Sequence, residues 1–135
     1  MPDEIPDDER MTPAEFRVIR EYLGLSGPWL ASALGVSDRT IRHWEAGKYP
    51  IPDGVRLAIE QMEDDAARAV EDGVRRLMDV PEPAVITYAT DEQFRSAHPE
   101  VTYPASWHRA VVARIAHEVP GLVITYPPKE WRSAE

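Results

Sequence analysis

The stretch LSGPWLASALGVSDRTIRHWEAGKYPIP, residues 25–52, constrains the fold of this chain more than any other part of the sequence. Ser26 and Ser37 are residues that cap helix N-termini, so each predicts the start of a helix. Gly35 predicts the end of the first helix, in a tight turn where a positive φ favours glycine. The stretch therefore predicts two short helices joined by a tight turn.

Side-chain size within this stretch indicates how the two helices pack. Ala31 is small at the point where the helices are expected to cross, and Val36, Ile41 and Trp44 are expected to fill the wedge between them. This pattern is typical of a helix-turn-helix. The side chains that then face outward from the second of the two helices are Asp38, Arg39, Arg42 and His43.

These residues resemble the Cro/CI-type regulators of the XRE helix-turn-helix family, over roughly residues 12–58. The resemblance implies that Arg20 and Glu45 form an internal ion pair. Two positions depart from the family pattern, because Gly27 and Ala46 replace a glutamine and an asparagine that contact DNA in many relatives. The structural positions of the motif are Arg20, Ala31, Gly35, Ile41, Trp44 and Glu45.

The resemblance also implies that the helix starting at Asp38 lies in the major groove of double-stranded DNA. Matching positions make Asp38, Arg39 and His43 base readers, and place Arg42 on a base or a phosphate. An arginine in this place reads guanine by a bidentate contact. The expected DNA-binding residues, phosphate contacts included, are Ser37, Asp38, Arg39, Arg42, His43, Lys48 and Tyr49.

The acidic charge of the chain limits how it can bind DNA. The formal net charge is -9, and the acids concentrate in residues 1–10 and 60–79. Because phosphate affinity comes largely from Lys and Arg, we expect few phosphate contacts and a modest salt dependence. The chain has no cysteine, no phosphate-binding glycine loop and no apolar run long enough for a membrane. We therefore expect a cytoplasmic protein that is not an enzyme and binds no cofactor, metal or membrane.

The sequence predicts four segments. Residues 1–10 form a disordered acidic leader, and 11–79 a DNA-binding domain that ends in a long fourth helix from Asp53 to about Met78. Residues 80–128 form a small dimerisation domain, and 129–135, with Trp131, a flexible tail. The fourth helix carries an apolar stripe that either packs on its own domain or pairs with a second copy. The stripe consists of Ile59, Met62, Ala66, Val70, Val74 and Leu77.

The C-terminal segment changes to an α/β pattern. Residues 84–88 (AVITY) and 122–126 (LVITY) are β-branched and aromatic, which predicts strands. Residues 91–97 and 105–119 predict a short and an amphipathic helix between them. Two strands alone are marginal in water, so this β-α-α-β unit needs the long helix or a second copy of the chain. The residues expected to dimerise are Val85, Tyr88, Trp107, Val111 and Ile124.

The whole layout resembles the anti-CRISPR-associated autorepressors and the related YdiL-like proteins, whose C-terminal part dimerises. We expect a mainly α fold: a lambda-repressor-like helix-turn-helix bundle, a linking helix and a small α/β unit. The function expected is a phage or mobile-element transcriptional repressor that binds an inverted repeat as a homodimer, near its own promoter. The alternative is an antitoxin that neutralises a toxin partner through its C-terminal unit.

Overall fold

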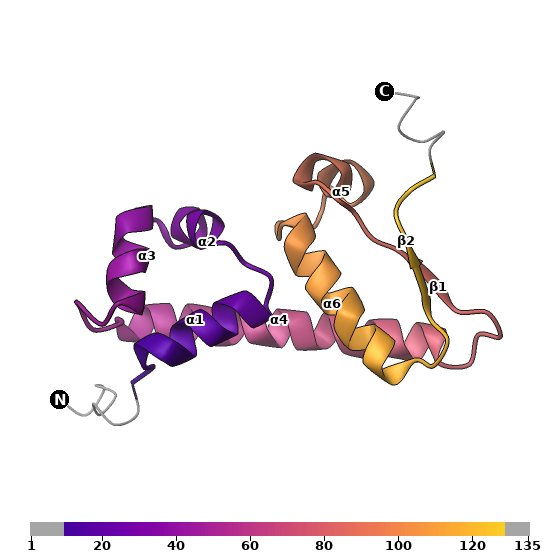
Figure 1. The fold of residues 1–135 in the computed structure, drawn as a ribbon, viewed down its shortest axis with the longest axis horizontal. Helices are drawn as coiled ribbons and strands as arrows, with labels where there is room; N and C mark the ends of the chain where they lie inside the picture. Colours follow the sequence, from indigo (N-terminus) through magenta and orange to yellow (C-terminus); the bar gives the residue numbers. More distant parts are fainter. Residues whose placement is uncertain (1–9, 129–135) are drawn as a thin grey trace. The chain divides into compact units, whose positions relative to one another are not determined.

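A computed structural model describes residues 10–128 and divides the chain into two units, an N-terminal unit up to Asp65 and a C-terminal unit from Ala66 (Figure 1). Helix α4 (Asp53–Leu77) begins in the first unit and ends in the second. The predicted leader, apart from its last residue, and the predicted tail lie outside the described residues. The expectation of a mainly helical fold with a small C-terminal α/β part is confirmed. None of the helices in the described range is both long and apolar enough to cross a bilayer.

Three short helices form the N-terminal unit with the start of α4: α1 (Pro13–Tyr22), α2 (Gly27–Leu34) and α3 (Asp38–Glu45). Local signals fix where they begin. The amide of Glu15 donates to the Thr12 hydroxyl at 3.0 Å, and the Thr12 amide donates to the Glu15 carboxylate at 2.8 Å. This reciprocal capping satisfies two amides that the first turn of a helix leaves without partners.

The turn between α2 and α3 has the predicted geometry. Gly35 has a φ of 71°, in the left-handed region that favours glycine. The Ser37 hydroxyl accepts from the Thr40 amide at 3.2 Å and caps α3. The tight turn and the cap that follows it therefore depend on residues within the six-residue stretch 35–40.

Trp44 belongs to the core of the N-terminal unit. Its ring packs edge-on against Phe16 of α1, with 5.9 Å between ring centroids and 73° between ring planes. Ile41 and the small Ala31 are also buried, at the contact between α3 and α2. Of the three residues predicted to fill the wedge, Ile41 and Trp44 are buried and Val36 is half-buried, so α3 is held with one face inward.

An ion pair joins α1 to the end of α3. Arg20 donates from Nε and Nη2 to the two carboxylate oxygens of Glu45, at 2.7 and 3.1 Å. Its Nη1 donates to the carbonyl of Leu25 at 3.0 Å. Both charged side chains are only 13% exposed. The pair that the family resemblance implied is present, and its bidentate form fixes the angle of the guanidinium group.

The C-terminal unit contains strands β1 (Ala84–Ile86) and β2 (Val123–Thr125) with helices α5 (Asp91–Ala97) and α6 (Ala105–Glu118) between them. The strands are parallel, with Val85 opposite Ile124. Both strands are shorter than the apolar runs that predicted them. A β-branched sequence favours extended backbone, but a residue belongs to a strand only where its backbone pairs with a neighbouring strand.

Helix α6 packs against the C-terminal half of α4. A Cβ atom added at Gly73 would collide with the side chain of Ile115, so the missing side chain lets the two helices approach closely. Along α4, Ile59, Ala66 and Val70 are buried, while Met62, Val74 and Leu77 are half-buried. The apolar stripe of α4 is therefore covered largely by the chain itself. This favours packing of the stripe within its own chain over pairing with a second copy.

Two histidines form polar contacts inside the C-terminal unit. His108 Nδ1 lies 2.7 Å from the Thr87 hydroxyl, and His98 Nε2 lies 3.2 Å from the Tyr88 hydroxyl. Burial, and to a smaller extent the nearby His98 and Arg109, lower the pKa of His108 to about 4. The His108 ring is therefore neutral at pH 7.

We expect Glu45→Gln to lower the free energy of unfolding by about 3 kcal/mol, because it leaves the Arg20 charge without its partner in a site largely shielded from water. Urea unfolding of the full chain, followed by circular dichroism, measures this. Arg17→Ala is the matched control: it breaks the exposed pair with Glu21, which is worth at most about 1 kcal/mol. Equal losses in the two variants would contradict a structural role for the Arg20–Glu45 pair.

We expect the C-terminal unit to lose stability on acidification. The pKa of His108 is lowered from 6.5 to about 4, so its contribution is fully present above pH 6.5 and is lost as pH falls through that range towards 4. The thermal midpoint of His108→Gln should fall less steeply than that of the native chain over this range. His117→Gln, at an exposed position of α6, is the control and should follow the native curve. A His108→Gln profile that overlays the native one would rule the histidine out as the source.

Candidate nucleic-acid interface

The first turn of α3 is exposed, and its N-terminus is capped by Ser37. The Ser37 hydroxyl binds both the Thr40 amide and the Thr40 hydroxyl, the latter at 3.0 Å. Asp38, Arg39 and Arg42 are exposed, since the opposite face of α3 carries the buried Ile41 and Trp44. The structure therefore brings the predicted base readers together on the outer face of one short helix.

Three cationic side chains at this surface have no ion pair among residues 10–128: Arg39, Arg42 and Lys48. The other arginines described in the N-terminal unit are all engaged. They form the pairs Arg10–Asp53, Arg17–Glu21, Arg20–Glu45 and Arg56–Glu60. The unit thus neutralises its cations elsewhere and leaves those of α3 and its following loop available to an external anion.

His43 and Tyr49 form an aromatic contact beside these cations. Their ring centroids lie 5.3 Å apart at an interplanar angle of 68°, and the Lys48 ammonium lies 5.8 Å from the centroid of the Tyr49 ring. Loss of water around the ring and then the charges of Lys48, Arg39 and Arg42 lower the pKa of His43. A neutral imidazole can both donate and accept a hydrogen bond, so it matches either kind of group on a base edge.

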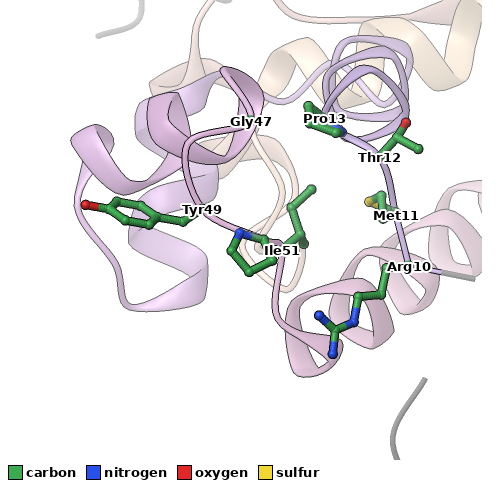
Figure 2. A pocket seen from close by; sticks show the side chains of 8 residues that line it. Arg10, Met11, Thr12, Pro13, Gly47, Tyr49 and Ile51 are labelled. Carbon is green, nitrogen blue, oxygen red and sulfur yellow. The ribbon is translucent and has the colours of Figure 1, made fainter. Parts of the chain in front are cut away.

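A hollow of about 460 Å³ lies next to the loop that follows α3 (Figure 2). Its walls come from the segment leading into α1, with Arg10 and Met11, and from the loop residues Gly47, Tyr49 and Ile51. In Figure 2 the Tyr49 ring extends away from the other labelled side chains. The sequence analysis assigned Arg10 to the leader. The ion pair between Arg10 and Asp53 joins residues far apart in the chain, so no local sequence pattern indicates it.

The residues predicted to dimerise do not share one environment. Tyr88, Trp107 and Val111 are between 4% and 7% exposed, so they have little surface to offer a second copy. The apolar pattern of these three residues therefore reflects packing inside the chain. Val85 is half-buried, and Ile124 is 44% exposed.

The exposed apolar surface of the C-terminal unit lies on its sheet instead. Side chains alternate along a strand and Ala84 is opposite Val123, so Ile86 and Val123 lie on one face of the sheet, here called the outer sheet face. Ile86 is 43% exposed and Val123 is 55% exposed. On the other face, Ile124 and Tyr126 line a second hollow of about 370 Å³ against α6. Sequence reasoning missed Ile86 and Val123, because alternation alone does not tell which face of a two-stranded sheet stays uncovered.

Comparison with known proteins assigns the chain to a family. A family model described as Aca2/YdiL-like matches residues 11–122, a range that includes helices α1 to α6 and the first strand. A search of curated proteins found no match. The likeness of the N-terminal helices to Cro/CI-type regulators stays a prediction, whereas the resemblance drawn from the whole layout is confirmed. The chain belongs to the Aca2/YdiL-like family of regulators.

Proposed function

We propose that this regulator is a sequence-specific DNA-binding repressor that acts as a homodimer on an inverted-repeat operator close to its own promoter. It acts by occupying the operator and needs no catalysis. The observation that carries the proposal is the group of three cations, Arg39, Arg42 and Lys48, that have no ion-pair partner in the described chain and lie on or just after α3. Family membership supports a regulatory role, and this surface supports DNA as the ligand.

The outer face of α3 fits the chemistry of base edges. Arg39 is a donor for the O6 and N7 atoms of guanine, and Asp38 is an acceptor for the amino group of cytosine. Among the described residues no ion pair joins Asp38 to Arg39, so both side chains are available to bases. His43 is half-buried against Tyr49, and this contact restricts where its ring points. Restricting a reading side chain reduces the entropy lost on binding.

The C-terminal sheet supports the homodimer in this proposal. A sheet of two three-residue strands is marginal in water, and its outer face leaves Ile86 and Val123 exposed. A second copy would cover this surface by an isologous contact, the commonest form of symmetric association. Two-fold symmetry in turn requires an operator with inverted half-sites, which in such repressors are about 34 Å apart or a multiple of it.

We expect Arg39→Ala to weaken operator binding by about 10-fold or more and to relax sequence preference at one base position, because it removes a bidentate base contact.

Lys48→Ala should weaken binding to all sequences alike and reduce the salt slope by about 1 per subunit, because it removes a phosphate contact. The operator is first selected from a random pool of duplexes, and affinity is then measured by fluorescence anisotropy over a series of salt concentrations.

Arg75→Ala is the matched control for these variants, since Arg75 is an exposed arginine in the C-terminal unit that pairs with Glu71 and Asp72. Its affinity and salt slope should equal those of the native chain. Native affinity in Arg39→Ala would sink the assignment of α3 to the groove. A native salt slope steeper than about -8 per dimer would show that phosphate contacts reach far beyond this face.

We expect the double variant Ile86→Lys/Val123→Lys to be a monomer at concentrations where the native chain is a dimer. Four like charges brought together across a two-fold axis should weaken association by about 100-fold or more. Sedimentation velocity measures the species, and circular dichroism checks that the exposed substitutions leave the fold intact. Val18→Lys, at an exposed apolar residue of α1, is the control and should remain dimeric. A double variant that still sediments as a dimer would place the interface elsewhere.

A further inference from the structure

The outer face of α3 and the loop that follows it carry positive charge that residues 10–128 do not neutralise. Arg39, Arg42 and Lys48 are exposed and form no ion pair in that range. Loss of water and then the charges of these three side chains lower the pKa of His43, so the three cations act together at one place. A group of like charges attracts an anionic partner whether or not DNA is present.

The chain itself supplies a segment of the opposite charge. Five of the nine residues before Arg10 are acidic, and none of the nine is a lysine or an arginine. These nine residues lie outside the described range, whereas Arg10, to which they are joined, lies within it. The five acids are Asp3, Glu4, Asp7, Asp8 and Glu9.

Arg10 joins this acidic segment to the N-terminal unit beside the cations. It lines the hollow of about 460 Å³ together with Gly47 and Tyr49, the two residues that flank Lys48 (Figure 2). Its Nε lies 3.9 Å from Oδ1 of Asp53, and this ion pair connects it to the first residue of α4. The acidic segment therefore starts next to the loop that carries Lys48.

Residues 1–9 are long enough to cover the outer face of α3. Nine residues span at most about 30 Å when extended. The eight residues of α3 span about 12 Å. A partner on so short a tether has an effective concentration on the order of millimolar, so a contact with a Kd of that order is made about half of the time.

We propose that the acidic residues 1–9 dock on the outer face of α3 and its following loop, pair with Arg39, Arg42 and Lys48, and compete with DNA for this surface. The docking is a property of the free protein, and its effect on DNA rests on the proposed function. The acids must leave before any duplex binds, so they lower the apparent affinity for operator and unrelated DNA by the same factor.

A spin label tests the docking without DNA. The chain has no cysteine, so Ile5→Cys accepts a single nitroxide label, which broadens the ¹H–¹⁵N signals of amides near it. We expect the amides of Arg39 and Arg42 to broaden, and the broadening to decrease as salt is added, because salt screens exposed charges.

The control for the label carries the same tether without its charge. In addition to the labelled Ile5→Cys, it has the substitutions Asp3→Asn, Glu4→Gln, Asp7→Asn, Asp8→Asn and Glu9→Gln. Its label should broaden the Arg39 amide about 3-fold less than the label on the acidic segment does. Equal broadening in the two proteins would overturn the docking. So would equal broadening of a ¹⁵N-labelled native chain by a spin-labelled second chain, because the contact would then lie between molecules.

The effect on DNA is measured with the same five substitutions and no label. We expect the neutral segment to raise the affinity for operator and for unrelated duplex alike by about 3-fold or more, because a face that is covered about two thirds of the time becomes free. The matched control makes the same change in net charge at five exposed acids of the C-terminal unit. Its substitutions are Glu71→Gln, Asp79→Asn, Glu82→Gln, Glu92→Gln and Glu118→Gln.

This control separates docking from general repulsion between the acidic chain and DNA. It should gain less than about 2-fold in affinity, because distant exposed charges are screened at physiological salt. An equal gain in the two variants would overturn the competition. If none of the proteins binds duplex DNA, the proposed function fails, whereas the spin-label result still decides whether residues 1–9 dock on α3.

Discussion

The ion pair between Arg20 and Glu45 is the interaction on which the presentation of α3 depends. It joins α1 to the last turn of α3, and the carbonyl of Leu25 takes the remaining donor direction of the guanidinium group. With Trp44 packed edge-on against Phe16, this pair fixes one face of α3 to the body of the N-terminal unit. The opposite face is held outward as a consequence, because a short helix packed along one side has no freedom to rotate.

The unpaired positive charges of the N-terminal unit lie on α3 and the loop that follows it, in a chain whose net charge is negative. A net charge of -9 opposes nonspecific attraction to DNA, yet the cations of α3 and its following loop have no acidic partner in the described residues. Arginines elsewhere in the N-terminal unit are paired within the fold. Such an arrangement concentrates positive potential where base edges would be read and leaves the rest of the molecule repelled by phosphate. In the DNA complex proposed above, discrimination between sequences would depend more on direct base contacts than in a strongly basic protein.

The elements that the sequence predicted best are those fixed by contacts between near neighbours. Thr12, Ser26 and Ser37 cap the helices they were expected to cap, and α5 has the predicted bounds. A cap is a hydrogen bond across three residues, so its signal is complete within a short stretch of sequence. The Arg20–Glu45 pair spans a long separation, and it was predicted only because the motif resembles a known family. The assignment of α3 residues to DNA rests on that same resemblance and on their exposure.

The sequence by itself determined the helices, the tight turn at Gly35 and the change to an α/β pattern after α4. Only the tertiary structure decided which apolar side chains are covered by the chain itself. Trp107 and Val111 look the same as Val123 in a hydropathy pattern, yet the first two are buried and Val123 is exposed. The physical reason is that periodicity records that one side of an element avoids water. What covers that side depends on packing between residues distant in sequence, and local patterns carry no information about it.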